Sequence, residues 1–192
     1  WDTERMLHLL AFLTLTALAD APQARAIDPK KSAARFSVQH IFVETVTGTV
    51  PILAGSVTLR GDSPVPVGLS ATLDPTRIKT GEDDRDGALQ TADWFDTKKF
   101  PTWTFVSTSV TPESATSFTV EGLLTIHGVA QPEHLDVTIG GDASHPSYHA
   151  VGHVDRHAFG MSVTRLDPAI GGDVTVTLDV VLRPARLTGA VS

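Results

Sequence analysis

Apolar and polar residues alternate with a period of two along most of this chain, which is the pattern of β-strands with one buried face. In the first such segment, 35–43, the even-numbered residues from Phe36 to Phe42 share one face. The alternation predicts about eight strands, at 35–43, 52–59, 67–73, 103–110, 117–126, 135–139, 149–154 and 174–182.

Residues 82–96 depart from this alternation. Ala88, Leu89, Ala92 and Phe95 stand near helical spacing, and acidic residues crowd the start of the segment, where they favour the positive end of a helix dipole. We expect a short helix that crosses between two strands. The chain is therefore predicted to be an all-β domain of about eight antiparallel strands with one connecting helix. The alternation alone leaves open whether these strands form a sandwich or a closed barrel.

The amino-terminal region has the pattern of a targeting segment. Residues 7–19 form an uncharged apolar run, and Ala24-Arg25-Ala26 follows with the small-x-small pattern that signal peptidase cuts after. The run is shorter than the roughly 20 residues that a membrane span needs. We expect residues 1–26 to be a signal peptide and residues 27–192 to form one domain, periplasmic or secreted. A short amphipathic or buried helix is the alternative for the run.

Composition narrows the function classes. The 192 residues carry a formal net charge of −7, which disfavours binding to nucleic acid. The absence of cysteine excludes thiolate nucleophiles, iron–sulfur clusters and cysteine zinc sites. A chain of this length buries enough apolar surface to fold without disulfides or a structural metal.

Motifs for catalysis or metal binding are lacking. The sequence has no G-x-S-x-G, H-E-x-x-H, Walker or G-x-G-x-x-G motif. His145, His149, His153 and His157 recur every four residues, but strand positions four apart lie about 13 Å from each other, too far to share a metal ion. We interpret them as a solvated or hydrogen-bonded strand face. His40 lies on an apolar face, either as a buried histidine or as a polar contact to a ligand head group.

Several motifs occur in a fixed order from residue 27 to residue 183. They include Phe36-Ser37-Val38-Gln39-His40, Asp93-Trp94-Phe95-Asp96 with Phe100-Pro101, Gly122-Leu123-Leu124-Thr125-Ile126-His127-Gly128-Val129, and Asp155-Arg156 with Phe159-Gly160-Met161. Together these motifs resemble the YceI family of exported bacterial proteins. Two positions depart from the family pattern, since Ala88 stands where a histidine is expected and Ala130 where a threonine is expected.

The resemblance implies an elongated, lipocalin-like antiparallel barrel whose central cavity takes a polyisoprenoid chain. It implies no enzymatic activity, no catalytic residue, no metal and no required cofactor. The expected ligand is an isoprenoid lipid or an isoprenoid quinone, and the sequence leaves the oligomeric state open, a homodimer included. The residues expected to line the cavity are Phe36, Val38, His40, Phe42, Phe95, Phe100, Phe105, Phe118, Leu124 and Ile126.

The expected function is the binding of a long-chain polyisoprenoid or a similar apolar lipid, as a periplasmic carrier or store. Two alternatives stay open from the sequence. One is a quinone-linked enzyme or electron-transfer accessory, for which His40 is the evident titratable group. The other is a stress-response interaction protein with a filled, ligand-free barrel.

Overall fold

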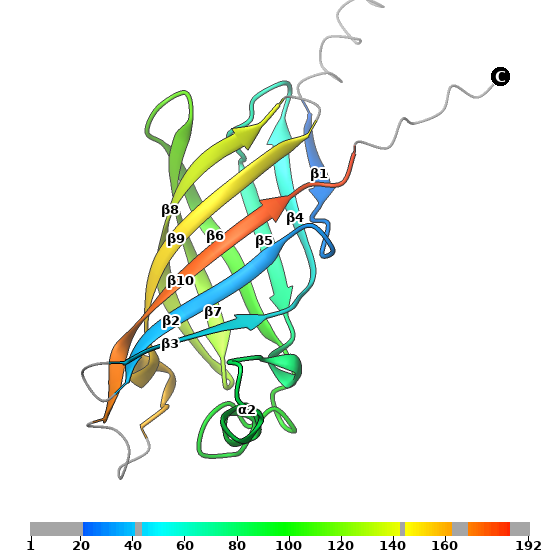
Figure 1. The fold of residues 1–192 in the computed structure, drawn as a ribbon. Helices are drawn as coiled ribbons and strands as arrows, with labels where there is room; N and C mark the ends of the chain where they lie inside the picture. Colours follow the sequence, from blue (N-terminus) through cyan, green and yellow to red (C-terminus); the bar gives the residue numbers. More distant parts are fainter. Residues whose placement is uncertain (1–20, 41–43, 143–144, 163–168, 185–192) are drawn as a thin grey trace, which may run out of the picture.

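Ten antiparallel strands form a single sheet that curls into an elongated barrel (Figure 1). The computed structural model describes residues 21–40, 44–142, 145–162 and 169–184. The strand order is β1-β4-β5-β6-β7-β8-β9-β10-β2-β3. The strands are β1 (Pro22–Ala26), β2 (Ala33–His40), β3 (Glu44–Val50), β4 (Ile52–Arg60), β5 (Gly68–Leu73), β6 (Trp103–Pro112), β7 (Ser117–Ile126), β8 (Val129–Gly141), β9 (Pro146–Asp155) and β10 (Ile170–Val181). The prediction of an all-β, lipocalin-like barrel is confirmed.

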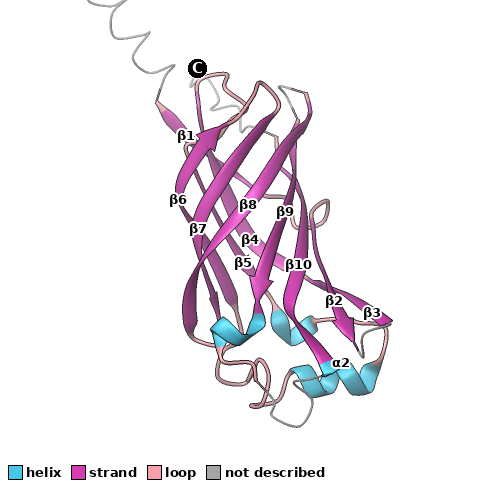
Figure 2. Cartoon of the chain, turned by 90° about the vertical axis from the view of Figure 1, so that its left-hand side faces the viewer, coloured by secondary structure: helices cyan, strands magenta, loops and turns pink. Residues whose placement is uncertain are grey.

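The helices gather at one end of the barrel (Figure 2). They are η1 (Pro75–Arg77), α2 (Asp83–Leu89) and η2 (Arg156–Phe159). We call this the helix end and the opposite end, where β1 lies, the β1 end. Among the described residues, no helix has the length and hydropathy needed to cross a lipid bilayer.

The eight predicted strands correspond to β2 and to β4 through β10, whereas β1, which lies in the expected signal peptide, and β3 were not predicted. In β3, Val46, Gly48 and Val50 are buried and threonines alternate with them. Because the central inward position is a glycine, the apolar signal of this strand is weak. A Cβ atom at Gly48 would lie 2.4 Å from Cζ of Phe36, so the Phe36 ring fills the space that a side chain would take.

The connecting helix is shorter than the predicted 82–96. It begins at Asp83 but ends at Leu89, and hydrogen-bonded turns follow it, with the Phe95 N–H donating to the Leu89 carbonyl at 3.0 Å. Asp86 anchors the helix, since its buried carboxylate accepts hydrogen bonds from the backbone N–H and the hydroxyl of Thr80, both at 2.7 Å. The apolar residues at 88–95 therefore do not form one helical face.

Backbone pairing joins the beginning of the chain to its end at the β1 end of the barrel. β1 runs antiparallel to β4, and Ile27 bridges to Leu182 beyond β10. The Asp28 N–H donates to the Val181 carbonyl and the Arg183 N–H to the Ala26 carbonyl, both at 2.8 Å. These bonds close the sheet where β4 would otherwise present an unpaired edge.

The expected cleavage site falls inside this closing strand. Ala24-Arg25-Ala26 is the second half of β1, paired with residues 56–58 of β4. Cleavage after Ala26 would therefore remove β1 from the barrel.

A chain that lacks residues 1–26 should be less stable than one that lacks residues 1–20 and keeps β1. We expect the free energy of unfolding to fall by about 2 kcal/mol, because each lost ladder hydrogen bond contributes about 1 kcal/mol and chain entropy offsets part of the loss. The bared edge of β4 should also promote self-association. Urea unfolding and light scattering on the two chains test this, and identical curves would show that β1 does not close the barrel.

Candidate functional site

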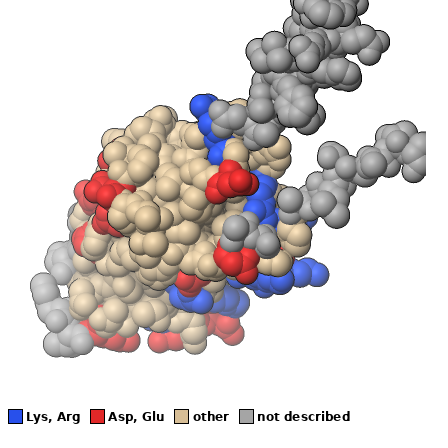
Figure 3. Space-filling view, turned by 90° about the horizontal axis from the view of Figure 1, so that it is seen from above, with Lys and Arg blue, Asp and Glu red and all other residues tan. Residues whose placement is uncertain are grey.

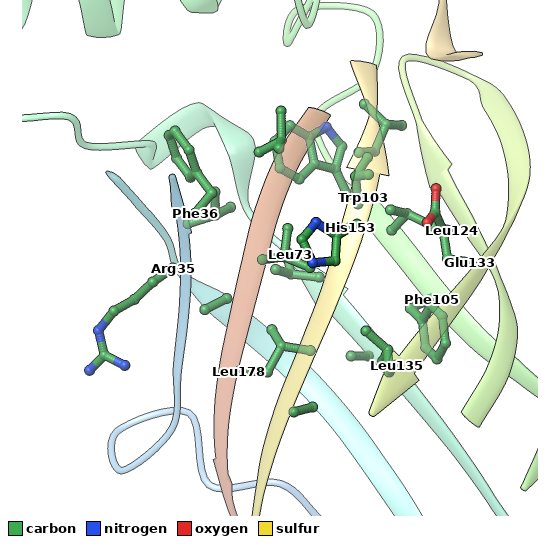
Figure 4. A pocket seen from close by; sticks show the side chains of 18 of the residues that line it. Arg35, Phe36, Leu73, Trp103, Phe105, Leu124, Glu133, Leu135, His153 and Leu178 are labelled. Carbon is green, nitrogen blue, oxygen red and sulfur yellow. The ribbon is translucent and has the colours of Figure 1, made fainter. Parts of the chain in front are cut away.

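The barrel encloses a cavity of about 420 Å³ (Figure 4). Every strand from β2 to β10 contributes to its wall, and α2 and the segment after it contribute at the helix end. The volume lies within the range of about 300–1,000 Å³ that is typical of small-molecule sites. The curled sheet has thus left a hollow interior in place of a filled core.

The strand alternation sets which side chains form the wall. On β7, Phe118, Val120 and Leu124 face inward, while the intervening Leu123 is 45% exposed on the outer face. On β8, Leu135 and Val137 face inward in the same way. The wall is consequently almost wholly aliphatic and aromatic.

Eight of the ten residues expected from the sequence line the cavity: Phe36, Val38, His40, Phe95, Phe105, Phe118, Leu124 and Ile126. Phe42 lies outside the described residues. Sequence reasoning did not include several other lining residues, among them Trp103, Glu133, Leu135 and Tyr148. The alternation would have found them if it had been extended towards the amino-terminal ends of β6, β8 and β9, where Trp103, Glu133 and Tyr148 lie.

Phe100 is not among the lining residues. It packs against the β7–β8 hairpin turn, where its ring meets the His127 ring edge to face at 5.1 Å between centroids. A Cβ atom at Gly128, which has a φ of +75°, would lie 2.5 Å from the Phe100 ring. Phe100 follows a turn and not a strand, so no alternation directs it inward.

The cavity is closed at the β1 end. Phe118 and Tyr148 meet edge to face at 5.8 Å between ring centroids. The Tyr148 hydroxyl donates to the Pro64 carbonyl of the β4–β5 loop at 2.9 Å. Burial raises the pKa of Tyr148 to about 12, so the hydroxyl stays a neutral donor. Uncharged side chains cover most of this face of the molecule (Figure 3).

The cavity opens at the helix end. The lining residues there are accessible to solvent, since Ala88 is exposed and Arg85 and His40 are partly exposed. Ala88, which replaces the histidine expected from the family pattern, lies at this mouth. Arg85 donates through Nε to the Thr80 hydroxyl at 2.8 Å and through Nη2 to the Thr80 carbonyl at 2.9 Å.

The rim of the mouth is acidic. Residues 79–86 include the cations Lys79 and Arg85 and the acids Glu82, Asp83, Asp84 and Asp86. Hydrogen bonds from Thr80, together with the Lys79 ammonium at 3.2 Å, hold the pKa of Asp86 below its ordinary value. The carboxylates of this rim therefore outnumber its cations at neutral pH.

Glu133 places a carboxyl group in the apolar wall. Burial raises its pKa to about 7, and the negative charge of Asp155 adds to the shift. The Arg156 guanidinium is held by backbone carbonyl oxygens, with Nε donating to Gly171 at 3.0 Å and Nη2 to Ile170 at 2.9 Å. Glu133 thus titrates near neutral pH inside the site.

The spaced histidines are largely exposed to solvent, and each contacts its own carboxylate, although His153 is also among the residues that line the cavity (Figure 4). His149 Nδ1 lies 2.8 Å from Asp179 and His153 Nδ1 lies 3.1 Å from Asp173, both across to β10. His145 and His157 contact Asp142 and Asp155. In the described part of the chain, no group of three or more His, Asp or Glu side chains is arranged to hold a metal ion.

Ionising Glu133 should destabilise the folded protein. Its folded-state pKa lies above the ordinary 4.5, so the folded state holds the proton more tightly than the unfolded chain does, and the free energy of unfolding falls as pH rises from about 5 to about 8. Because the group is only half buried, we expect this contribution to be about 1–2 kcal/mol.

Glu133→Gln keeps the shape and removes the charge. Urea unfolding at pH 5 and pH 8 should show a smaller loss of stability for this variant than for the wild type, with the exposed Glu113→Gln as control. The raised pKa of His134, which is caused mainly by Glu121, shifts stability in the same direction in all three proteins and cancels in the comparison. Parallel pH profiles for wild type and Glu133→Gln would contradict the assignment.

Comparisons with known proteins agree with this geometry. A family model described as the YceI-like domain matches residues 26–182. Protein YceI of Escherichia coli O157:H7 is 31% identical over 111 residues, which are 58% of this chain and 58% of that protein, so the match covers less than two thirds of the relative's length. A UPF0312 protein of Pseudomonas putida strain W619 is 29% identical over 137 residues, 68% of this chain and 71% of that protein.

Solved structures share the fold. Burkholderia cenocepacia BcnA superposes with a TM-score of 0.72 at 22% identity, over 81% of this chain and 98% of its own. A polyisoprenoid binding domain from Saccharophagus degradans has a TM-score of 0.62 at 16% identity, over 86% of this chain and 99% of its own. The family match runs from the last residue of β1 to the residue after β10, and the chain therefore belongs to the YceI-like domain family.

Proposed function

We propose that this protein binds a long-chain polyisoprenoid, or a lipid of similar shape and polarity, inside the barrel and acts as a periplasmic carrier or store. The observation that carries the proposal is the apolar cavity, closed at the β1 end and open at the helix end. The fold shared with a protein named a polyisoprenoid binding domain supports the choice of ligand. The apolar run at residues 7–19 supports export.

Burial of hydrocarbon supplies the affinity in this proposal. Each CH₂ group moved from water into the cavity contributes about 0.8 kcal/mol, so a chain of many carbons offsets the cost of association. The wall presents Phe, Leu, Ile and Val side chains along most of its length and few hydrogen-bonding groups. Such a site selects for the length and width of an apolar chain more than for a particular head group.

Native mass spectrometry of protein purified from its own host, followed by organic extraction, tests the ligand. We expect one prenyl lipid per barrel, whose mass gives the chain length and head group. A protein that carries no lipid, and takes none up when prenyl alcohols or quinones are offered, would refute lipid binding and favour a ligand-free interaction protein.

Two adjacent leucines of β7 provide a matched pair of variants. Leu124 lines the cavity, whereas Leu123 points outward and is 45% exposed. Leu124→Asp places a charge in the hydrocarbon site, so we expect it to lose at least about 90% of the bound lipid, which corresponds to about 1.4 kcal/mol or more. Leu123→Asp should keep the wild-type amount.

Extracted lipid per mole of protein is the readout for both variants, with circular dichroism to show that each is folded. Full lipid content in a folded Leu124→Asp protein would contradict the assignment of the cavity as the lipid site.

A further inference from the structure

Glu133 is a partly buried acid in the cavity wall. It belongs to the inward-facing residues of β8, together with Leu135 and Val137. Its register partner on β7 is Gly122, over which the apolar Phe105 ring lies, so the neighbouring strand offers Glu133 no polar side chain at this position. On the other side, the pairing of β8 with β9 ends at Leu135 and Gly152, before Glu133 is reached. Figure 4 shows the carboxyl group beside Leu124 in the wall.

The charged groups around Glu133 do not neutralise it. Asp155, at the end of β9, carries the same charge and raises the pKa of Glu133. Arg156 and His157 of η2 are engaged, the first with backbone carbonyls and the second with Asp155. The partly exposed histidines of the wall are paired too, His134 with Glu121 and Asp136, and His153 with Asp173. Among the described residues, none forms a salt bridge or hydrogen bond with the Glu133 carboxyl group.

An unpaired acid in an apolar wall adds nothing to stability, since desolvation penalises its charged form and no partner repays the penalty. Groups of this kind occur preferentially at functional sites. We propose that Glu133 is a specificity-determining residue of the cavity, which admits neutral lipids together with a proton and disfavours anionic amphiphiles. This inference rests on the proposed lipid binding.

Proton uptake follows from covering the carboxyl group with hydrocarbon. A lipid that fills the cavity displaces the water that solvates Glu133, so the bound state favours the neutral acid more strongly than the empty state does. Affinity for a neutral lipid should then fall by up to about tenfold per pH unit above pH 7. An anionic amphiphile faces in addition the ionised Glu133 and the acidic rim at the mouth.

The test measures displacement of the neutral fluorescent probe N-phenyl-1-naphthylamine by phytol, a neutral branched C20 alcohol. We expect phytol to bind wild-type protein at least about 10-fold more weakly at pH 9 than at pH 6. Glu133→Gln, which stays neutral, should bind phytol equally at both pH values, within about twofold. His149→Gln is the control, because it removes an imidazole on the outer face of β9 that does not line the cavity, and it should keep the wild-type pH dependence.

Phytanic acid, an anion with the same carbon skeleton, tests the discrimination. At pH 9, Glu133→Gln should gain more affinity for phytanate than for phytol, because the variant removes a charge–charge repulsion as well as the desolvation of Glu133. Equal gains for the two ligands would overturn the discrimination against anions. Thermal unfolding of the variants at pH 6 verifies that each is folded.

The outcomes separate this inference from the proposed function. If phytol displaces the probe from wild-type protein equally at pH 6 and pH 9, lipid binding stands and the role of Glu133 is refuted. If neither phytol nor longer prenyl alcohols displace the probe at any pH, the proposed function itself fails. If displacement of the probe by phytol still depends on pH in folded Glu133→Gln, the group that controls binding is not Glu133, and the inference is refuted.

Discussion

The cavity depends on the closure of one curled sheet. A sheet with ten strands has two edges, and unpaired backbone groups at either edge would invite association or collapse. Here the Ile27–Leu182 bridge joins the start of the barrel to its end, and the Thr49–Lys79 bridge covers the edge of β3 near the helix end. With both edges engaged, the wall is held by backbone hydrogen bonds, and the interior does not need to be filled by side chains to keep the strands together.

Glycines opposite phenylalanines help to keep that interior open. The rings of Phe36 and Phe105 lie over Gly48 and Gly122, where a Cβ atom would come within 2.4 Å and 2.3 Å of them. Each ring rests in the space that the missing side chain leaves on a neighbouring strand. Large aromatic residues thus contribute apolar wall area without projecting across the lumen, which is how a barrel rich in Phe can be hollow.

The period-two pattern was sufficient to place eight strands and to orient the seven expected lining residues that lie on them, because inward and outward positions are fixed once a strand is recognised. Phe95, the eighth, lies in the turns that follow α2. The pattern failed where other forces act. Phe100 belongs to a turn and packs on Gly128, and β3 is obscured by its inward glycine. Glu133 precedes the predicted start of its strand, and its role depends on the register with Gly122 and on the end of the β8–β9 pairing, which no single-strand pattern contains.

The closing strand has a consequence for the timing of proteolysis. A peptidase needs an accessible, extended backbone at the bond it cuts, and in the folded barrel the backbone of Ala24-Arg25-Ala26 is already paired with β4. Cleavage at Ala26 and insertion of β1 are therefore mutually exclusive, competing reactions of the same nascent segment. The small-x-small pattern thus overlaps a segment that the folded barrel uses, and a chain cut after Ala26 would fold without β1.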